Sequence, residues 1–100
     1  MNHIGKEKWN VAFYLGTVYL RYYRDRTAAA RYIALAAQVP GAPRVKLAGM
    51  ANTFFAQSGN AGEGLRVLMF TYETSDDPEV RRHLAEKIRT AGNVRIPVVK

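Results

Sequence analysis

A basic cluster between residues 21 and 31 holds the side chains with the most definite chemistry. Two tyrosines, Tyr22 and Tyr23, are interleaved with its arginines, and Asp25 is the one acidic residue within it. The basic patch consists of Arg21, Arg24, Arg26 and Arg31. Guanidinium groups contact carboxylate or phosphate oxygens, and exposed aromatic rings stack on nucleic-acid bases. The cluster predicts contact with an acidic partner, unless its arginines only stabilise a helix end and its tyrosines pack.

No other set of residues has the types and spacing of an active site. The histidines, His3 and His83, are far apart and lack carboxylates at metal-ligand spacing. The acidic residues at 76–79 precede or begin a helix, where capping explains them. The glycine-rich stretch 58–65 has neither the following Lys-Ser/Thr nor the preceding strand of a phosphate-binding loop. We therefore expect no enzyme, no bound metal and no cofactor.

The composition is that of one folded domain. The chain has 100 residues, of which 48% are hydrophobic and 23% charged, which argues against disorder. It has no cysteine, so disulfides, thiolate metal sites and cysteine nucleophiles are excluded. Its net charge of +7 favours an acidic protein, nucleic acid or anionic lipid as partner.

The first twenty residues have the charged and then apolar order of a signal peptide. No small-residue cleavage site follows directly, however, because the next residues are RYYRDR. The apolar run is also about half the length that a spanning helix needs. We expect neither a signal peptide nor a membrane span, which leaves the cytoplasm as the default compartment.

Apolar residues recur at helical spacing between glycine and proline breakers, which predicts an all-α fold. The expected helices run from about 9 to 23, 27 to 39, 43 to 58, 60 to 74 and 78 to 91. Asp25 or Thr27 is expected to cap the second helix, Asn60 with Glu63 fits a capping box, and Gly92 is expected to end the fifth. The expected inward residues include Leu15, Tyr19, Ala28, Tyr32, Phe55, Leu68, Met69 and Leu84.

The helices fall into two similar units with a period of about 36 residues. In the first unit the pattern consists of Leu15-Gly16, Tyr19, Ala28, Tyr32 and Pro40. The positions 36 residues after the first four of these hold Ala51-Asn52, Phe55, Gly64 and Leu68 in the second unit. This pattern resembles the tetratricopeptide repeat of bacterial proteins. The resemblance implies a single domain, 1–100, forming a right-handed α-solenoid segment. Its parts would be two antiparallel hairpins, 9–42 and 43–75, a capping helix, 77–91, and a tail, 92–100. The alternative is a plain five-helix bundle.

The resemblance also implies a non-enzymatic scaffold that binds a protein or peptide through the concave face of its first and third helices. The partner-binding residues expected there are Asn10, Phe13, Thr17, Arg21, Lys46, Met50, Thr53 and Gln57. Phe13 would be an apolar anchor, and Arg21 and Lys46 would meet acidic side chains. Phe13 and Thr17 replace two residues of the family's carboxylate clamp, so we do not expect one. Packing of Phe13 and Met50 in the core is the alternative.

Two other functions remain open from the sequence. A small basic nucleic-acid-binding protein would use the cluster at 21–31, although no recognition helix or aromatic RNA motif accompanies it. A helical subunit that associates through apolar end faces would follow from having only two repeats. In that case the tail residues Ile96, Val98 and Val99 would cover an end face or pair with another copy.

Overall fold

The computed structural model describes residues 3–95, and the side-chain surroundings of residues 9–91. Over that range the chain folds into helices without a strand, as the sequence predicts. The helices are α1 (His3–Tyr22), α2 (Arg26–Ala37), α3 (Arg44–Gln57), α4 (Ala61–Glu73) and α5 (Pro78–Arg95). Ile96, Val98 and Val99, which the sequence suggests as cover for an end face, lie outside the described residues.

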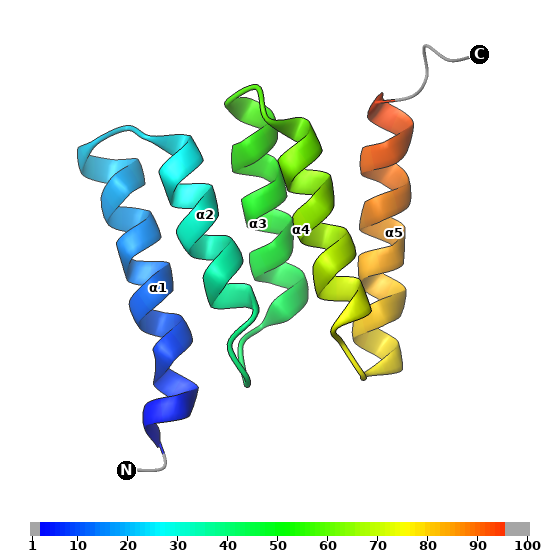
Figure 1. Cartoon of the computed structure of the whole chain (residues 1–100), viewed down its shortest axis with the longest axis horizontal. Coiled ribbons are helices and arrows are strands. Elements are labelled where there is room, and N and C mark those ends of the chain that lie inside the picture. The colour runs from blue at the N-terminus through cyan, green and yellow to red at the C-terminus, as the bar shows by residue number, and fades with distance from the viewer. Residues whose placement is uncertain (1–2, 96–100) are drawn as a thin grey trace.

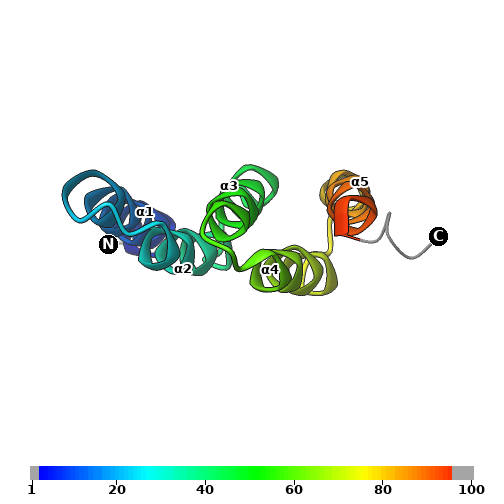
Figure 2. The ribbon, with the colours of Figure 1, turned by 90° about the horizontal axis from the view of Figure 1, so that it is seen from above.

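Consecutive helices run antiparallel and stand side by side along the longest axis (Figure 1). Figure 2 shows that they alternate between two sides, with α1, α3 and α5 on one side and α2 and α4 on the other. Each helix packs against the next, and α3 also contacts α5. The result is an elongated slab of 53 × 36 × 13 Å whose two broad faces are lined by different helices.

Small side chains let the helices approach closely. The fully buried positions in the middle of the slab include Ala29, Ala30, Ala36, Ala37, Ala48 and Ala51. The larger buried side chains, Ile33, Leu47, Leu68 and Leu84, fill the space between successive helices. Alanine is also the strongest helix former, so these residues favour both the helices and their close packing.

A glycine marks the closest crossing in each hairpin. A Cβ atom on Gly16 of α1 would lie 3.0 Å from Cγ1 of Ile33 and 3.1 Å from the carbonyl oxygen of Ala29. A Cβ atom on Gly64 of α4 would lie 3.0 Å from both the Cα and the carbonyl oxygen of Asn52 on α3. The glycine therefore lies on the first helix, α1, in the first hairpin and on the second helix, α4, in the second hairpin.

Polar side chains join elements that are far apart in sequence. Gln38, at the end of α2, donates a hydrogen bond of 2.8 Å to the hydroxyl of the buried Thr71 on α4. Arg44, at the start of α3, donates to the Ser75 hydroxyl over 2.7 Å and to the Thr74 hydroxyl over 3.2 Å. The Gln38 bond joins the first hairpin to α4, and Arg44 joins the start of α3 to the loop that precedes α5.

Two of the expected helix starts are confirmed. The Asp25 carboxylate accepts a hydrogen bond of 3.0 Å from the backbone N–H of Ala28 and so caps α2. Before α5, the Asp77 carboxylate accepts a bond of 2.9 Å from the N–H of Glu79, and Pro78 is the first helical residue. Proline fits there because the first helical N–H has no partner inside the helix.

The capping box at Asn60 was a wrong prediction. Asn60 precedes α4, but its side chain forms no capping hydrogen bond with that helix. Instead its amide donates weakly to the Thr27 hydroxyl over 3.4 Å and to the Ser58 carbonyl over 3.3 Å. The side chain thus links the α3–α4 turn to the start of α2, a contact that local sequence does not encode.

Four further predictions were wrong. Leu15 is 38% exposed and Met69 is also exposed, because the neighbouring positions Gly16 and Leu68 point inward. Helix α5 continues through Gly92 to Arg95, and α1 begins at His3 instead of near Trp9. Glycine lowers helix propensity by about 1 kcal/mol relative to alanine, which neighbouring turns can offset.

Candidate partner-binding site

A groove between α3 and α5 is the most developed hollow on the α1, α3 and α5 side of the slab. It encloses about 530 Å³ and is called the α3–α5 groove below. Ala61 of α4 contributes to its lining, which shows that the groove reaches down to the helix between α3 and α5. The lining residues are Gly49, Asn52, Thr53, Ala56, Gln57, Ala61, Glu86, Lys87, Thr90 and Ala91.

The lining of this groove combines side chains that can form hydrogen bonds with small apolar side chains. Asn52 and Gln57 supply carboxamides, and neither forms a hydrogen bond with another residue whose side chain is described. The Thr53 hydroxyl donates to the Gly49 carbonyl over 3.1 Å, so its oxygen is still able to accept. The end of the Lys87 side chain lies across Gly49, 3.3 Å from where a Cβ atom would stand. The groove thus offers donors, acceptors, the cation of Lys87 and the carboxylate of Glu86.

The structure separates the expected partner-binding residues into two groups. On α3, Thr53 and Gln57 line the α3–α5 groove, while Lys46 is exposed outside that lining. Met50 is half-buried and packs against the core cluster. The four expected residues of α1, which are Asn10, Phe13, Thr17 and Arg21, do not line this groove.

The residues of the α1 group have different surroundings. Phe13 is half-buried against the core, with its ring centroid 6.1 Å from that of Trp9. Thr17 donates its hydroxyl to the Tyr14 carbonyl over 2.7 Å, a bond within the helix. Asn10 and Arg21 are exposed. Replacing Phe13 would therefore remove core packing, so Phe13→Ala does not report on partner binding alone.

The arginines of the basic patch lie at the α1–α2 turn and on the first part of α2, and all four are exposed. Arg21, Arg24, Arg26 and Arg31 form no ion pair with any described side chain. Arg24 has a backbone φ of 55°, in the left-handed region, which tightens the turn. The patch is therefore free to meet an anionic group.

A tyrosine stack lies beside this patch. The rings of Tyr19 and Tyr32 are parallel to within 14° with centroids 5.3 Å apart, and the ring of Tyr23 has its centroid 5.3 Å from that of Tyr19, at an angle of 39°. Electrostatic interaction with Tyr32 raises the pKa of Tyr19 above its ordinary value. The stack joins α1 to α2 and leaves Tyr23 exposed at its end.

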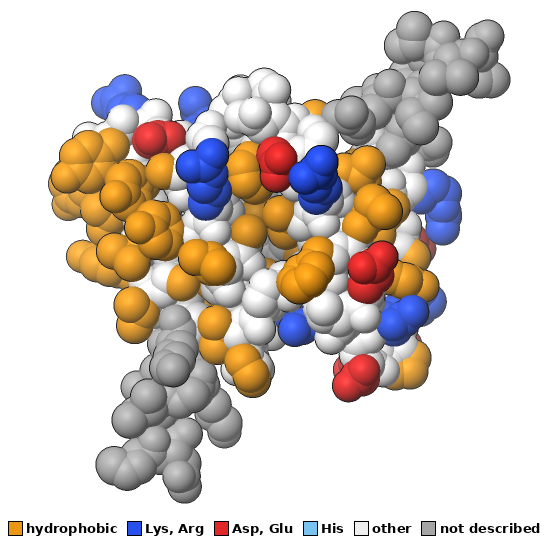
Figure 3. All heavy atoms as spheres, viewed as in Figure 1, with side chains coloured by type: hydrophobic (Ala, Val, Ile, Leu, Met, Phe, Trp, Pro, Cys, Tyr) orange, Lys and Arg blue, Asp and Glu red, His pale blue; other side chains and the backbone are white. Residues whose placement is uncertain are grey.

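A second, more apolar groove lies between α2 and α4 on the opposite side of the slab. Phe55 and Val67 contribute to its lining, Leu35 and Phe70 are exposed beside it, and Arg31 and Arg66 contribute the positive charges. Figure 3 views this side and shows basic side chains flanking an acidic one, with hydrophobic side chains below them. The acidic lining residue is Glu63, 3.9 Å from Arg66.

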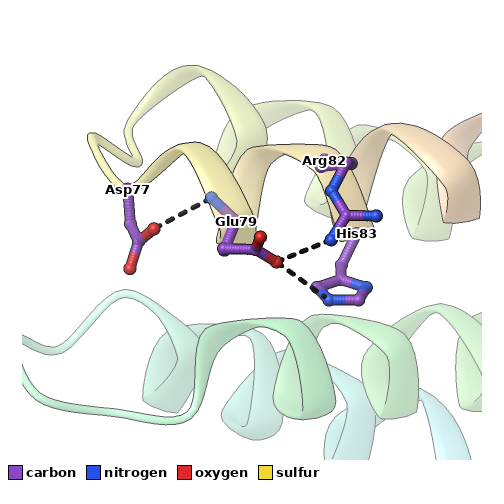
Figure 4. A network of polar contacts seen from close by, with 4 residues as sticks. All are labelled: Asp77, Glu79, Arg82 and His83. Carbon is purple, nitrogen blue, oxygen red and sulfur yellow. Dashed lines mark hydrogen bonds and ion pairs between the residues drawn. The ribbon is translucent and has the colours of Figure 1, made fainter.

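The charged residues at the start of α5 form a local network (Figure 4). Glu79 accepts a hydrogen bond of 2.7 Å from Arg82 and lies 3.6 Å from Nε2 of His83. All these side chains are exposed, so their contribution to stability is small. The network supports helix capping and lacks the nucleophile–base arrangement of an active site.

Arg81 differs in its surroundings from the exposed arginines of α5, Arg82 and Arg89. It is half-buried, with its guanidinium 4.3 Å from the centre of the Tyr72 ring. It also donates to the carbonyl oxygens of Ser75, over 3.1 Å, and Tyr72, over 3.4 Å. Arg81 therefore fastens α5 to the end of α4.

Lys87 and Thr90 line the α3–α5 groove but were missed as site residues. The sequence pattern assigns 77–91 to a capping helix, and the polar side of such a helix is expected to face solvent. The available signal was the length of the helix, since an α5 as long as α3 can form the second wall of a groove.

Within residues 3–95, no helix is both long and apolar enough to cross a membrane. The same part of the chain contains no group of three or more His, Asp or Glu side chains arranged to hold a metal ion. No protein-family model, curated protein or solved structure matches the chain.

Proposed function

We propose that this protein is a non-catalytic scaffold of the tetratricopeptide type that binds an acidic peptide or protein segment. Two features support this type of array. The helices alternate between two sides, and each hairpin has a glycine at its closest crossing. The crossing residues Gly16 and Asn52 are about one period of 36 residues apart. In such an array α1, α3 and α5 line the concave face.

The α3–α5 groove is the single observation that carries the proposal. Its carboxamides can hydrogen-bond both the N–H and the C=O groups of a peptide backbone, which is how an extended segment is held without a specific sequence. Its alanines leave room for the segment to lie close to the helices. Glu86 balances the charge of Lys87 in the lining, so Lys46 outside the groove and the net charge of +7 favour an acidic residue in the bound segment.

Selection from a random peptide display library tests this proposal directly. We expect the selected peptides to be enriched in Asp and Glu, and to shift the backbone NMR signals of α3 and α5 more than those of α2. Peptides that perturb the α2 and α4 side instead would place the site in the second groove and contradict the proposal.

The substitution Thr53→Arg is expected to raise the Kd of a selected peptide at least tenfold, about 1.4 kcal/mol. Thr53 is exposed, so the longer side chain enters the groove without disturbing the core. Isothermal titration calorimetry measures the change, and far-UV circular dichroism checks the helices. Arg66→Glu, on the opposite side, is the matched control and should leave the Kd within about twofold. Equal affinity of Thr53→Arg and the parent protein would exclude the groove.

Single-stranded nucleic acid is the second candidate partner, favoured by the exposed, unpaired arginines beside the tyrosine stack. Binding of a labelled oligonucleotide that weakens steeply as salt increases, and that is lost in Arg24→Glu/Arg26→Glu, would support it. Those substitutions lie away from the α3–α5 groove and should not change peptide affinity. The two functions are therefore separable in one set of variants.

A further inference from the structure

The outward side of α1 is an apolar stripe with no covering element among the described residues. It consists of Val11, Tyr14, Leu15, Val18 and Tyr22 and is called the α1 outer face. Tyr14 and Tyr22 are 66% and 73% exposed, and Val11 is 61% exposed. Val11, Leu15, Val18 and Tyr22 follow one another at intervals of four, three and four residues. This is the spacing of a helix that packs lengthwise against another helix.

The other end of the slab has the opposite character. The exposed residues of α5 include Arg82, His83, Glu86 and Arg89. Figure 3 shows hydrophobic side chains gathered along the α1 edge, and basic and acidic ones interspersed along the α5 edge. A head-to-tail stack would bury the charges of α5 against the apolar α1 outer face, which is unfavourable. Among pairings of these two ends, α1 against α1 buries the most apolar surface on both sides.

The area of the α1 outer face is sufficient for the interface of a dimer. Each aromatic side chain offers about 150–250 Å², so two tyrosines that are mainly exposed contribute about 280 Å², and the aliphatic residues raise the total to about 450 Å² per chain. Two copies would bury about 1,000 Å² once flanking side chains are included, which is the lower limit for a specific interface. An apolar surface of this size on one helix is also at the level that marks an interaction site.

We propose that two copies of this chain associate through their α1 outer faces, antiparallel and related by a two-fold axis. Leu15 would lie against Val18 of the partner subunit, and Val11 against Tyr22 of the partner subunit. The charges decide the direction, because Arg21, Arg24 and Arg26 all lie at the same end of α1. A parallel pair would bring these six guanidinium groups together. An antiparallel pair places them at opposite ends and also opposes the helix dipoles.

This association leaves the α3–α5 groove open in both copies, so it does not depend on the proposed peptide binding. A two-fold pairing is closed, since the same surface is used by both partners and no further copy can be added. The dimer would present two grooves, and a partner with two binding segments would gain avidity from it.

Sedimentation equilibrium tests the association. We expect the 11.2 kDa chain to sediment at about twice that mass at about 50 µM, and Tyr14→Glu/Tyr22→Glu to be monomeric with unchanged helicity. Val18→Lys is a second variant with the same expected result. The matched control, Arg82→Glu/Arg89→Glu on α5, should remain dimeric. A monomeric parent protein would overturn the proposal and leave the face to a different partner. A dimer that survives both sets of α1 substitutions would overturn it as well.

Cysteine cross-linking tests the direction, because the chain contains no cysteine of its own. A mixture of Val11→Cys and Tyr22→Cys proteins should form a mixed disulfide on mild oxidation, since the two positions face each other. Tyr22→Cys alone should not, because the two copies of that position would be about 16 Å apart along the helices. A disulfide requires Cα atoms within about 7 Å. Efficient cross-linking of Tyr22→Cys with itself would indicate a parallel pair and overturn the antiparallel arrangement.

Discussion

Gly16→Leu is expected to lower the free energy of unfolding by about 1–3 kcal/mol or more. The first added atom, Cβ, would already stand 3.0 Å from the side chain of Ile33 and 3.1 Å from the Ala29 carbonyl oxygen. The Ala29 carbonyl belongs to the backbone of α2, so α1 and α2 must separate to make room for the rest of the leucine. Thermal unfolding followed by circular dichroism measures the effect. For a domain of this size, 1 kcal/mol corresponds to about 4–8 °C in Tm.

Gly49→Ala is the control for the general effect of removing a helical glycine. The three atoms nearest to a Cβ atom at position 49 would all belong to the flexible end of the Lys87 side chain. The added methyl group should therefore be accommodated, and the better helix propensity of alanine should stabilise α3 by about 0.5–1 kcal/mol. If Gly16→Leu melts at the same temperature as the parent protein, the close crossing of α1 and α2 is not required.

The sequence predicts a helix boundary well where that boundary depends on local chemistry, and it misses the start of α1 and the end of α5. Asp25 caps α2 and Pro78 begins α5, since both effects act within one turn of the chain. The apolar face of α1 was harder to assign, because Leu15 and Gly16 are adjacent and α1 is apolar on more than one side. Close packing against Ile33 selects Gly16 for the inward position, and that contact is known only from the tertiary arrangement. Leu15 is consequently directed outward.

The candidate site was predictable only in part for the same reason. The second stripe of α3, which includes Thr53 and Gln57, follows from helical periodicity once the inward face is assigned. The wall formed by α5 depends on the distance between α5 and α3, and the helical periodicity of the sequence does not determine that distance. From the sequence, Lys87 and Thr90 are therefore expected on the solvent-facing side of a capping helix. Phe13 shows the converse case, since an aromatic residue on a predicted binding stripe packs against Trp9 and the core.

Leu84→Ala is expected to destabilise the protein by about 2–5 kcal/mol, which is a large part of the stability of a domain of this size. Leu84 is fully buried and is the central core contact of α5. The other apolar contacts of α5 come from the half-buried Val80, Ile88 and Ala91. Because the main contacts of α5 are with α4 and α3, the loss of stability is concentrated at that end of the slab. Hydrogen exchange should therefore accelerate more in α5 than in α2.

The functional consequence of Leu84→Ala distinguishes a groove that needs α5 from one that does not. Lys87 and Thr90 form one wall of the α3–α5 groove, so peptide affinity should fall together with the protection of α5. Arg89→Ala, an exposed position on the same helix, is the control and should change stability by less than about 0.5 kcal/mol. Peptide affinity that is retained while α5 exchanges freely would show that α3 binds without its second wall. In that case the site would have to be sought on α3 and α1 alone.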